Sequence, residues 1–147
     1  MLGTAIALAA KVFDGKFDKG GSPYMLHCLQ VMYWVDQNDT ELMQIAVLHD
    51  VVEDSDLTIN DLRQMGFSER VLSGLESLTH WDNEPYDNYI RRVATNADSI
   101  KVKLADLRHN SDITRMKGLR EKDIKRLEKY HRAFNFLSQL NGFSLNP

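Results

Sequence analysis

The chain has 147 residues, of which 43% are hydrophobic and 27% charged, and its formal net charge is −3. This length and composition are typical of one soluble globular domain. Lysine and arginine are spread along the chain, which argues against nucleic acid or an anionic membrane as a partner. A single cysteine, Cys28, excludes an internal disulfide framework and a cysteine-only zinc site, and favours a reducing cytoplasm.

The apolar start of the chain, MLGTAIALAA, raises the question of a signal peptide. No basic stretch precedes this run, the run is too short to span a bilayer, and a polar segment follows it. We therefore expect an amphipathic first helix over residues 2–13. Gly15, Gly20 and Gly21 come next and indicate a loop.

Apolar residues recur at spacings of three and four through most of the chain, which predicts an all-α fold of about seven or eight helices. The second helix should begin at Ser22-Pro23, with serine as the N-cap and proline in the first helical position, and run to about Val35. Asp39 lies in a polar triplet that should cap a third helix. That helix should lead directly into His49.

Cap signals continue in the middle of the chain. Thr58, with Asp61 three residues later, is close to a capping box, and Gly66 is placed as the C′ glycine of the same short helix. The next two helices should begin at Ser68 and Pro85.

The alternating pattern of residues 100–104 admits a strand as well as a helix. We expect a helix, because one isolated strand has nothing to pair with. A long amphipathic helix should run from Leu119 to about Leu140. The sequence therefore predicts one domain over residues 1–140, followed by a short tail over residues 141–147.

Ionisable side chains at four places suggest a metal site: His27, the pair His49-Asp50, the pair Glu53-Asp54, and Asp106. Taken alone, a histidine on an apolar helix is more often a core residue than a ligand. Residues 48–54, however, place four ionisable side chains among apolar neighbours, and buried imidazoles and carboxylates need partners.

On a helix, Glu53 would lie four residues after His49 and three after Asp50, so the three side chains would converge on one point. A divalent cation would satisfy them. Mixed imidazole and carboxylate ligands favour manganese, while iron, zinc and magnesium stay open. The alternative is that Glu53 and Asp54 form a solvated turn and that His49 caps a carbonyl group.

Three segments closely resemble motifs of the HD superfamily: GSPYMLH at residues 21–27, LHDVVED at residues 48–54, and KLADLRHN at residues 103–110. They are most similar to the hydrolase domain of the Rel/SpoT-type enzymes, which degrade the alarmone (p)ppGpp. Their order and approximate spacing also agree, over roughly residues 5 to 115. The resemblance implies a compact helical HD-domain bundle and a metal-dependent hydrolase that releases pyrophosphate from the 3′ position.

The resemblance also implies roles for individual residues. The metal ligands would be His27, His49, Asp50 and Asp106. Glu53 and Asp54 would orient or activate the attacking water. Lys19 and Asn110 would contact the nucleotide.

Other residues bear on the substrate. Lys103 and Arg108 flank Asp106, and we expect both to bind phosphate, whereas most other cations should be solvated. Asp18 stands where the alarmone hydrolases usually carry an arginine that stacks on guanine, so the base remains open. His109 is expected to be structural.

Two alternative functions therefore remain: an HD-type phosphatase acting on another nucleotide, such as a 5′-nucleotide or NADPH, and a catalytically silent nucleotide-binding module. The intact Glu53-Asp54 pair argues against the silent module. Oligomeric state is left open.

Overall fold

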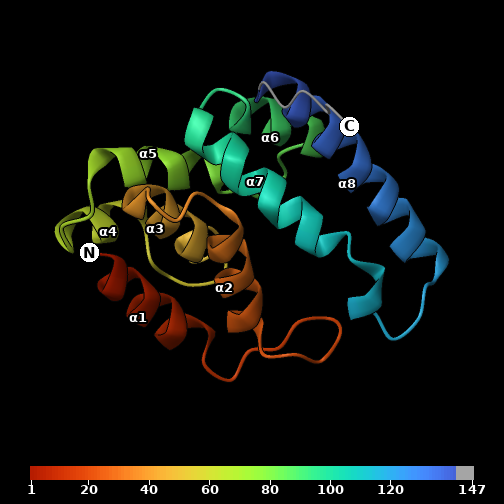
Figure 1. Cartoon of the computed structure of the whole chain (residues 1–147), viewed down its shortest axis with the longest axis horizontal. Coiled ribbons are helices and arrows are strands. Elements are labelled where there is room, and N and C mark those ends of the chain that lie inside the picture. Colours follow the sequence, from red (N-terminus) through yellow and green to blue (C-terminus); the bar gives the residue numbers. More distant parts are fainter. Residues whose placement is uncertain (142–147) are drawn as a thin grey trace.

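A computed structural model describes residues 1–141 as an all-helical bundle, as the apolar periodicity predicts (Figure 1). The expected tail lies outside these residues from position 142 onward. The elements are α1 (Leu2–Phe13), α2 (Tyr24–Trp34), α3 (Thr40–Leu48), α4 (Ile59–Gln64), α5 (Glu69–Leu78), α6 (Tyr86–Val93), α7 (Ala97–Asn110), the short 3-10 helix η1 (Ile113–Arg115) and α8 (Glu121–Leu140). In place of strands, residues 1–141 contain one isolated antiparallel bridge, between Phe17 and Pro23.

Helix α3 forms the centre of the bundle and contacts α1, α2, α5 and α7. Its residues from Leu42 to Leu48 are all buried, which is typical of a helix enclosed on every side. Helix α7 packs against α2, α3 and α5 on one side, and α8 runs back beside it (Figure 1). Helices α2, α3 and α7 therefore meet in the interior. None of the helices in residues 1–141 is both long and apolar enough to cross a membrane.

Most of the predicted helix starts are confirmed. The Asp39 carboxylate accepts a hydrogen bond from the Leu42 N–H at 3.0 Å, and the Thr58 and Asp61 side chains form the reciprocal capping box. Ser68 caps α5. Gly66 follows α4 with φ of 90°, a left-handed conformation that favours glycine. The segment at residues 100–104 is helical, within α7.

The predicted start of α2 was wrong by one residue. Pro23 is the N-cap and the helix begins at Tyr24, so Ser22 does not cap it. Ser22 belongs to the preceding loop, where its N–H donates to the Asp18 carboxylate and its carbonyl accepts from the Asp18 N–H.

Of the two alternatives for residues 49–54, the helix that would align His49, Asp50 and Glu53 is wrong, because α3 ends at Leu48, and the turn with His49 bonded to a carbonyl group is found. The His49 Nδ1 donates to the Ala46 carbonyl at 2.8 Å, so a side chain occupies the acceptor that a continuing helix would use. Residues 49–54 form turns instead. The last helix likewise begins at Glu121 rather than Leu119.

Candidate metal centre and adjoining cavity

Four predicted ligands meet where α2, α7 and the turn after α3 converge. The Nε2 atoms of His27 and His49 are 3.3 Å apart. The Asp106 Oδ1 lies 3.1 Å from the His27 Nε2 and 3.6 Å from the His49 Nε2. The Asp50 Oδ2 lies 2.9 Å from the His49 Nε2 and 3.8 Å from the His27 Nε2. Ligand atoms from His27, His49 and Asp50 all lie within 4.8 Å of one another.

These side chains are almost fully enclosed. His27, His49 and Asp106 are 2%, 3% and 3% exposed, whereas the Asp50 side chain keeps 17% of its surface open. Burial favours the neutral form of the His49 imidazole, but the charges of Asp50 and Asp106 prevail and raise its pKa well above the usual value. The cluster therefore attracts positive charge.

This donor set fits a divalent cation. Two imidazole nitrogens and carboxylate oxygens face one another across about 3 to 4 Å. Ligands held about 2.1 Å from one ion are themselves about 3.0 to 3.4 Å apart at octahedral or tetrahedral angles. Nitrogen and oxygen donors without thiolate suit manganese, iron or zinc.

Neighbouring groups orient both carboxylates of the cluster. The Tyr24 hydroxyl donates to the Asp50 Oδ2 at 2.5 Å. The Lys103 ammonium and the Asn110 amide donate to the two Asp106 oxygens at 2.8 and 2.7 Å. Although burial opposes its ionisation, the charge of Lys103 and the histidine hydrogen bonds keep the pKa of Asp106 well below its usual value.

Glu53 and Asp54 lie on the turn that follows the cluster. The Glu53 Oε1 accepts a hydrogen bond from the His80 N–H at 2.5 Å, which ties this carboxylate to the loop after α5. Loss of water around the carboxylate raises its pKa to about 6, and the charge of Asp50 adds to the effect. For Asp54, which is exposed, loss of surrounding water and the charge of Asp50 again raise the pKa.

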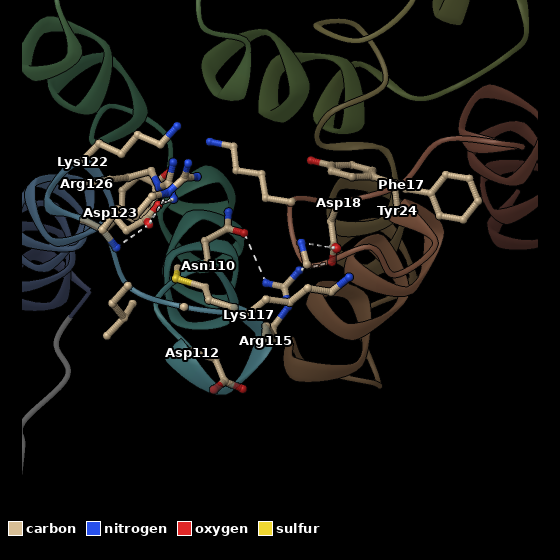
Figure 2. A pocket seen from close by; sticks show the side chains of 17 residues that line it. Phe17, Asp18, Tyr24, Asn110, Asp112, Arg115, Lys117, Lys122, Asp123 and Arg126 are labelled. Atoms are coloured by element: carbon tan, nitrogen blue, oxygen red, sulfur yellow. Dashed lines mark hydrogen bonds and ion pairs between the residues drawn. The ribbon is translucent and has the colours of Figure 1, made fainter.

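A cavity of about 920 Å³ adjoins the cluster. Tyr24 and Asn110, which bond to Asp50 and Asp106, both line it. In Figure 2, one side is formed by Lys122, Asp123 and Arg126 of α8, the opposite side by Asp18 and Tyr24, and Asn110 and Arg115 lie between them. A ligand in this cavity would therefore lie beside the proposed metal.

Positive charge dominates the cavity. Its cationic lining residues are Lys19, Arg115, Lys117, Arg120, Lys122 and Arg126, and its acidic ones are Asp18, Asp112 and Asp123. Loss of water around the ammonium group, together with the nearby charges of Arg126 and Lys122, lowers the pKa of Lys19, so the α8 cations oppose its charge. An anion such as phosphate would relieve this repulsion.

Asp18 and Arg115 join the loop before α2 to the segment after α7. The Arg115 Nη2 donates to the Asp18 Oδ2 at 2.9 Å, and the Asp18 Oδ1 accepts from the Gly20 and Ser22 N–H groups, each at 2.9 Å. Arg115 also donates to the His109 carbonyl at 2.7 Å. The loop that carries Lys19 is thus fixed against the end of α7.

Substituting Gly20 with alanine should disturb this junction. The added Cβ would lie 2.2 Å from the Arg115 carbonyl oxygen, so the backbone would have to move. We expect a loss of about 1–3 kcal/mol in the free energy of unfolding, measured by denaturant titration. Gly118→Ala is the matched control, since its Cβ meets nothing within 4 Å. Equal stability of the two variants would contradict the predicted close contact.

The structure separates two residues that were expected to act together. Lys103 lies three residues before Asp106 and bonds to it. Arg108 lies two residues after Asp106, about 200° further around the helix, and its guanidinium stacks on Trp34 at 4.2 Å from the ring centroid. Arg108 lines a different cavity, of about 580 Å³, and is not brought to the cluster.

Sequence reasoning missed the roles of His109 and Arg115. The His109 Nδ1 lies 2.7 Å from the His27 Nδ1, so it touches a predicted ligand. Burial lowers the pKa of His109 to about 4, assisted by the charges of Arg115 and His27. Helical spacing could have indicated His109, which lies three residues after Asp106 on the same face of α7.

The chain is similar to parts of longer, curated proteins. It is 29% identical over 119 residues to the guanosine-3′,5′-bis(diphosphate) 3′-pyrophosphohydrolase of Aquifex aeolicus (strain VF5), covering 76% of this chain and 17% of that protein. The identity is 30% over 128 residues with the protein of the same name from Vibrio cholerae, covering 81% and 18%. For the bifunctional (p)ppGpp synthase/hydrolase SpoT of Escherichia coli (strain K12), it is 28% over 119 residues, covering 72% and 17%.

The chain thus spans less than a fifth of the length of these relatives. No protein-family model matches the chain. Two of the three names state a guanosine-3′,5′-bis(diphosphate) 3′-pyrophosphohydrolase, and the third states a (p)ppGpp synthase/hydrolase.

Proposed function

We propose that this chain is a metal-dependent phosphohydrolase of the HD superfamily that removes the 3′-pyrophosphate from (p)ppGpp or a related alarmone. The observation that carries the proposal is the buried cluster of two histidines and two aspartates beside a large cationic cavity. Similarity to proteins named as 3′-pyrophosphohydrolases supports the substrate class.

In this proposal His27, His49, Asp50 and Asp106 hold one divalent cation, with Mn²⁺ as the first choice. A bound divalent cation polarises a phosphoryl oxygen and lowers the pKa of a water molecule. The protein supplies the ligand orientation through Tyr24, which fixes the Asp50 carboxylate.

We assign the role of general base to Glu53, one of the two proposed catalytic carboxylates. Its raised pKa, about 6, suits a group that must accept a proton near neutral pH. As the water oxygen bonds to the phosphorus, Glu53 takes one proton from that water. The bond from phosphorus to the 3′ oxygen breaks with its electron pair on the oxygen, which takes up a proton from solvent and leaves as a hydroxyl group. Asp54 stands on the same turn, with its backbone carbonyl held by the Lys16 ammonium at 2.5 Å.

The nucleotide would occupy the cationic cavity. Lys19 and Asn110 line it, as do Lys122 and Arg126, which extend the cationic surface along α8. Lys103 lies closer to the metal site, where it already neutralises Asp106. The substrate carries phosphate groups at both its 3′ and 5′ positions. One could lie at the metal cluster while the other lies in the adjoining cationic cavity.

One observation favours a second candidate, an HD-type phosphatase acting on another nucleotide such as a 5′-nucleotide or NADPH. Asp18, at the position where the alarmone hydrolases usually carry a stacking arginine, is committed to the ion pair with Arg115. A base would therefore have to be held by other groups. The silent nucleotide-binding module remains the alternative without turnover.

The test is a panel of nucleotides, including ppGpp, a 5′-nucleotide and NADPH, incubated with the purified chain with and without Mn²⁺. We expect Mn²⁺-dependent release of pyrophosphate from ppGpp. A phosphate assay run with and without pyrophosphatase measures it, because pyrophosphate is detected only when pyrophosphatase is present. Release of phosphate from another nucleotide would favour the broader phosphatase. Binding of nucleotide without any release would favour the silent module.

A further inference from the structure

His27 and His49 both present Nε2 to the cluster, so both need a proton on Nδ1 to keep the Nε2 lone pair free. For His49 the partner of Nδ1 is the Ala46 carbonyl at 2.8 Å. A carbonyl oxygen can only accept, so this contact by itself places a proton on the His49 Nδ1.

For His27 the partner is another imidazole. The Nδ1 atoms of His27 and His109 lie 2.7 Å apart, a hydrogen-bond distance across which one nitrogen must donate and the other accept. Unlike a carbonyl, an imidazole nitrogen is able to do either. Without a cation, the His27 Nε2 can donate to the Asp106 Oδ1 at 3.1 Å, and His109 then donates to His27. A cation on the His27 Nε2 requires the opposite direction, with His27 as the donor and His109 as the acceptor.

The surroundings hold the His109 ring in one place. Its ring stacks on that of His27, with centroids 5.0 Å apart and an angle of 14° between the planes. Trp34 packs its edge against the same ring at 5.6 Å, and Arg115 binds the His109 carbonyl at 2.7 Å. These contacts keep the two Nδ1 atoms facing each other.

We propose that His109 is a positioning residue for the metal site: its unprotonated Nδ1 accepts the Nδ1 proton of His27 and so directs the His27 Nε2 lone pair into the cluster. The inference rests on the metal site of the proposed function and is independent of which nucleotide is cleaved. Groups that orient a metal-bound histidine through its second nitrogen typically contribute about 10- to 100-fold to metal affinity.

Two substitutions separate the hydrogen bond from the packing. His109→Phe keeps a ring stacked on His27 but has no acceptor. His109→Asn loses the ring but offers the Oδ1 atom at the place of Nδ1. His131→Phe is the control, because His131 is an exposed histidine of α8 that contacts Asn135.

The experiment measures Mn²⁺ affinity by calorimetry and, in the protein loaded with diamagnetic Zn²⁺ at neutral pH, the protonation of the His109 nitrogens by ¹⁵N NMR. We expect a His109 Nδ1 without a proton in the Zn²⁺-loaded unsubstituted chain, about 10- to 100-fold weaker Mn²⁺ binding in His109→Phe, recovery to within a few-fold in His109→Asn, and no change in His131→Phe.

Three results would overturn the role of His109: a His109 protonated on Nδ1 in the Zn²⁺-loaded unsubstituted chain, unchanged Mn²⁺ affinity in His109→Phe, or equal weakening in both His109 variants. The NMR measurement needs no substitution, so it decides the question even if a variant fails to fold. An unsubstituted chain that binds neither Mn²⁺ nor Zn²⁺ would instead contradict the metal site of the proposed function.

Discussion

Replacing Asp50 with alanine is expected to abolish both Mn²⁺ binding and nucleotide hydrolysis. The Asp50 Oδ2 lies 2.9 Å from the His49 Nε2, and its charge is one of only two carboxylate charges in the cluster. Because a metal contributes several kcal/mol to charge stabilisation in phosphoryl transfer, losing it should reduce kcat/KM roughly 1,000-fold or more. Calorimetry with Mn²⁺ and the pyrophosphate assay measure the two losses.

Asp56→Ala is a suitable control for this substitution, since Asp56 is an exposed aspartate close in sequence to the cluster. It should leave Mn²⁺ binding and hydrolysis unchanged. Full activity in the Asp50→Ala variant would refute the proposed metal centre.

Replacing Glu53 with glutamine should separate catalysis from metal binding. The glutamine Oε1 can still accept from the His80 N–H, so the local turn should persist, but the side chain can no longer take a proton. We expect kcat to fall about 10²- to 10⁴-fold, with Mn²⁺ affinity nearly unchanged. For Asp54→Asn we expect a smaller fall in kcat, because Glu53 is the proposed proton acceptor.

The role of Glu53 as a general base also predicts how the rate of hydrolysis changes with pH. A general base acts only when ionised, so with a Glu53 pKa of about 6 the rate should fall as the pH drops below that value, by about tenfold per unit. A cation bound nearby favours the carboxylate and should shift this limb to lower pH. In Glu53→Gln the limb should disappear; a limb of unchanged shape would assign the proton transfer to another group.

The helix boundaries that depend on local contacts were predictable. Asp39 caps α3 through a bond to Leu42, and Thr58 and Asp61 bond to each other at the start of α4. The N-terminus of each helix is therefore determined by residues three positions apart. The predictions failed where a loop or a side chain competes for backbone groups. Ser22 bonds to Asp18 instead of capping α2, and the His49 imidazole takes the Ala46 carbonyl.

The candidate site divides in the same way. The sequence motifs pointed to all four proposed ligands, and the structure brings these side chains together. The contacts that surround them were not predictable, because His27 and His109 are 82 positions apart and Asp18 and Arg115 are 97 positions apart. Arg108 was expected to bind phosphate because it is close to Asp106 in sequence. It lies on a different face of α7 and stacks on Trp34 instead.

The long sequence separation of the ligands has a consequence for how the protein matures. A growing chain that has completed α2 and α3 holds His27, His49 and Asp50, but it lacks Asp106 and the Lys103 and Asn110 bonds that accompany it. Tight coordination thus becomes available only after α7 has been made and has docked against α2 and α3. The ion would then stabilise the completed fold over its precursors, because a ligand that binds only the native state shifts the folding equilibrium toward it. Hydrolysis of a nucleotide would begin only in chains whose assembly is finished.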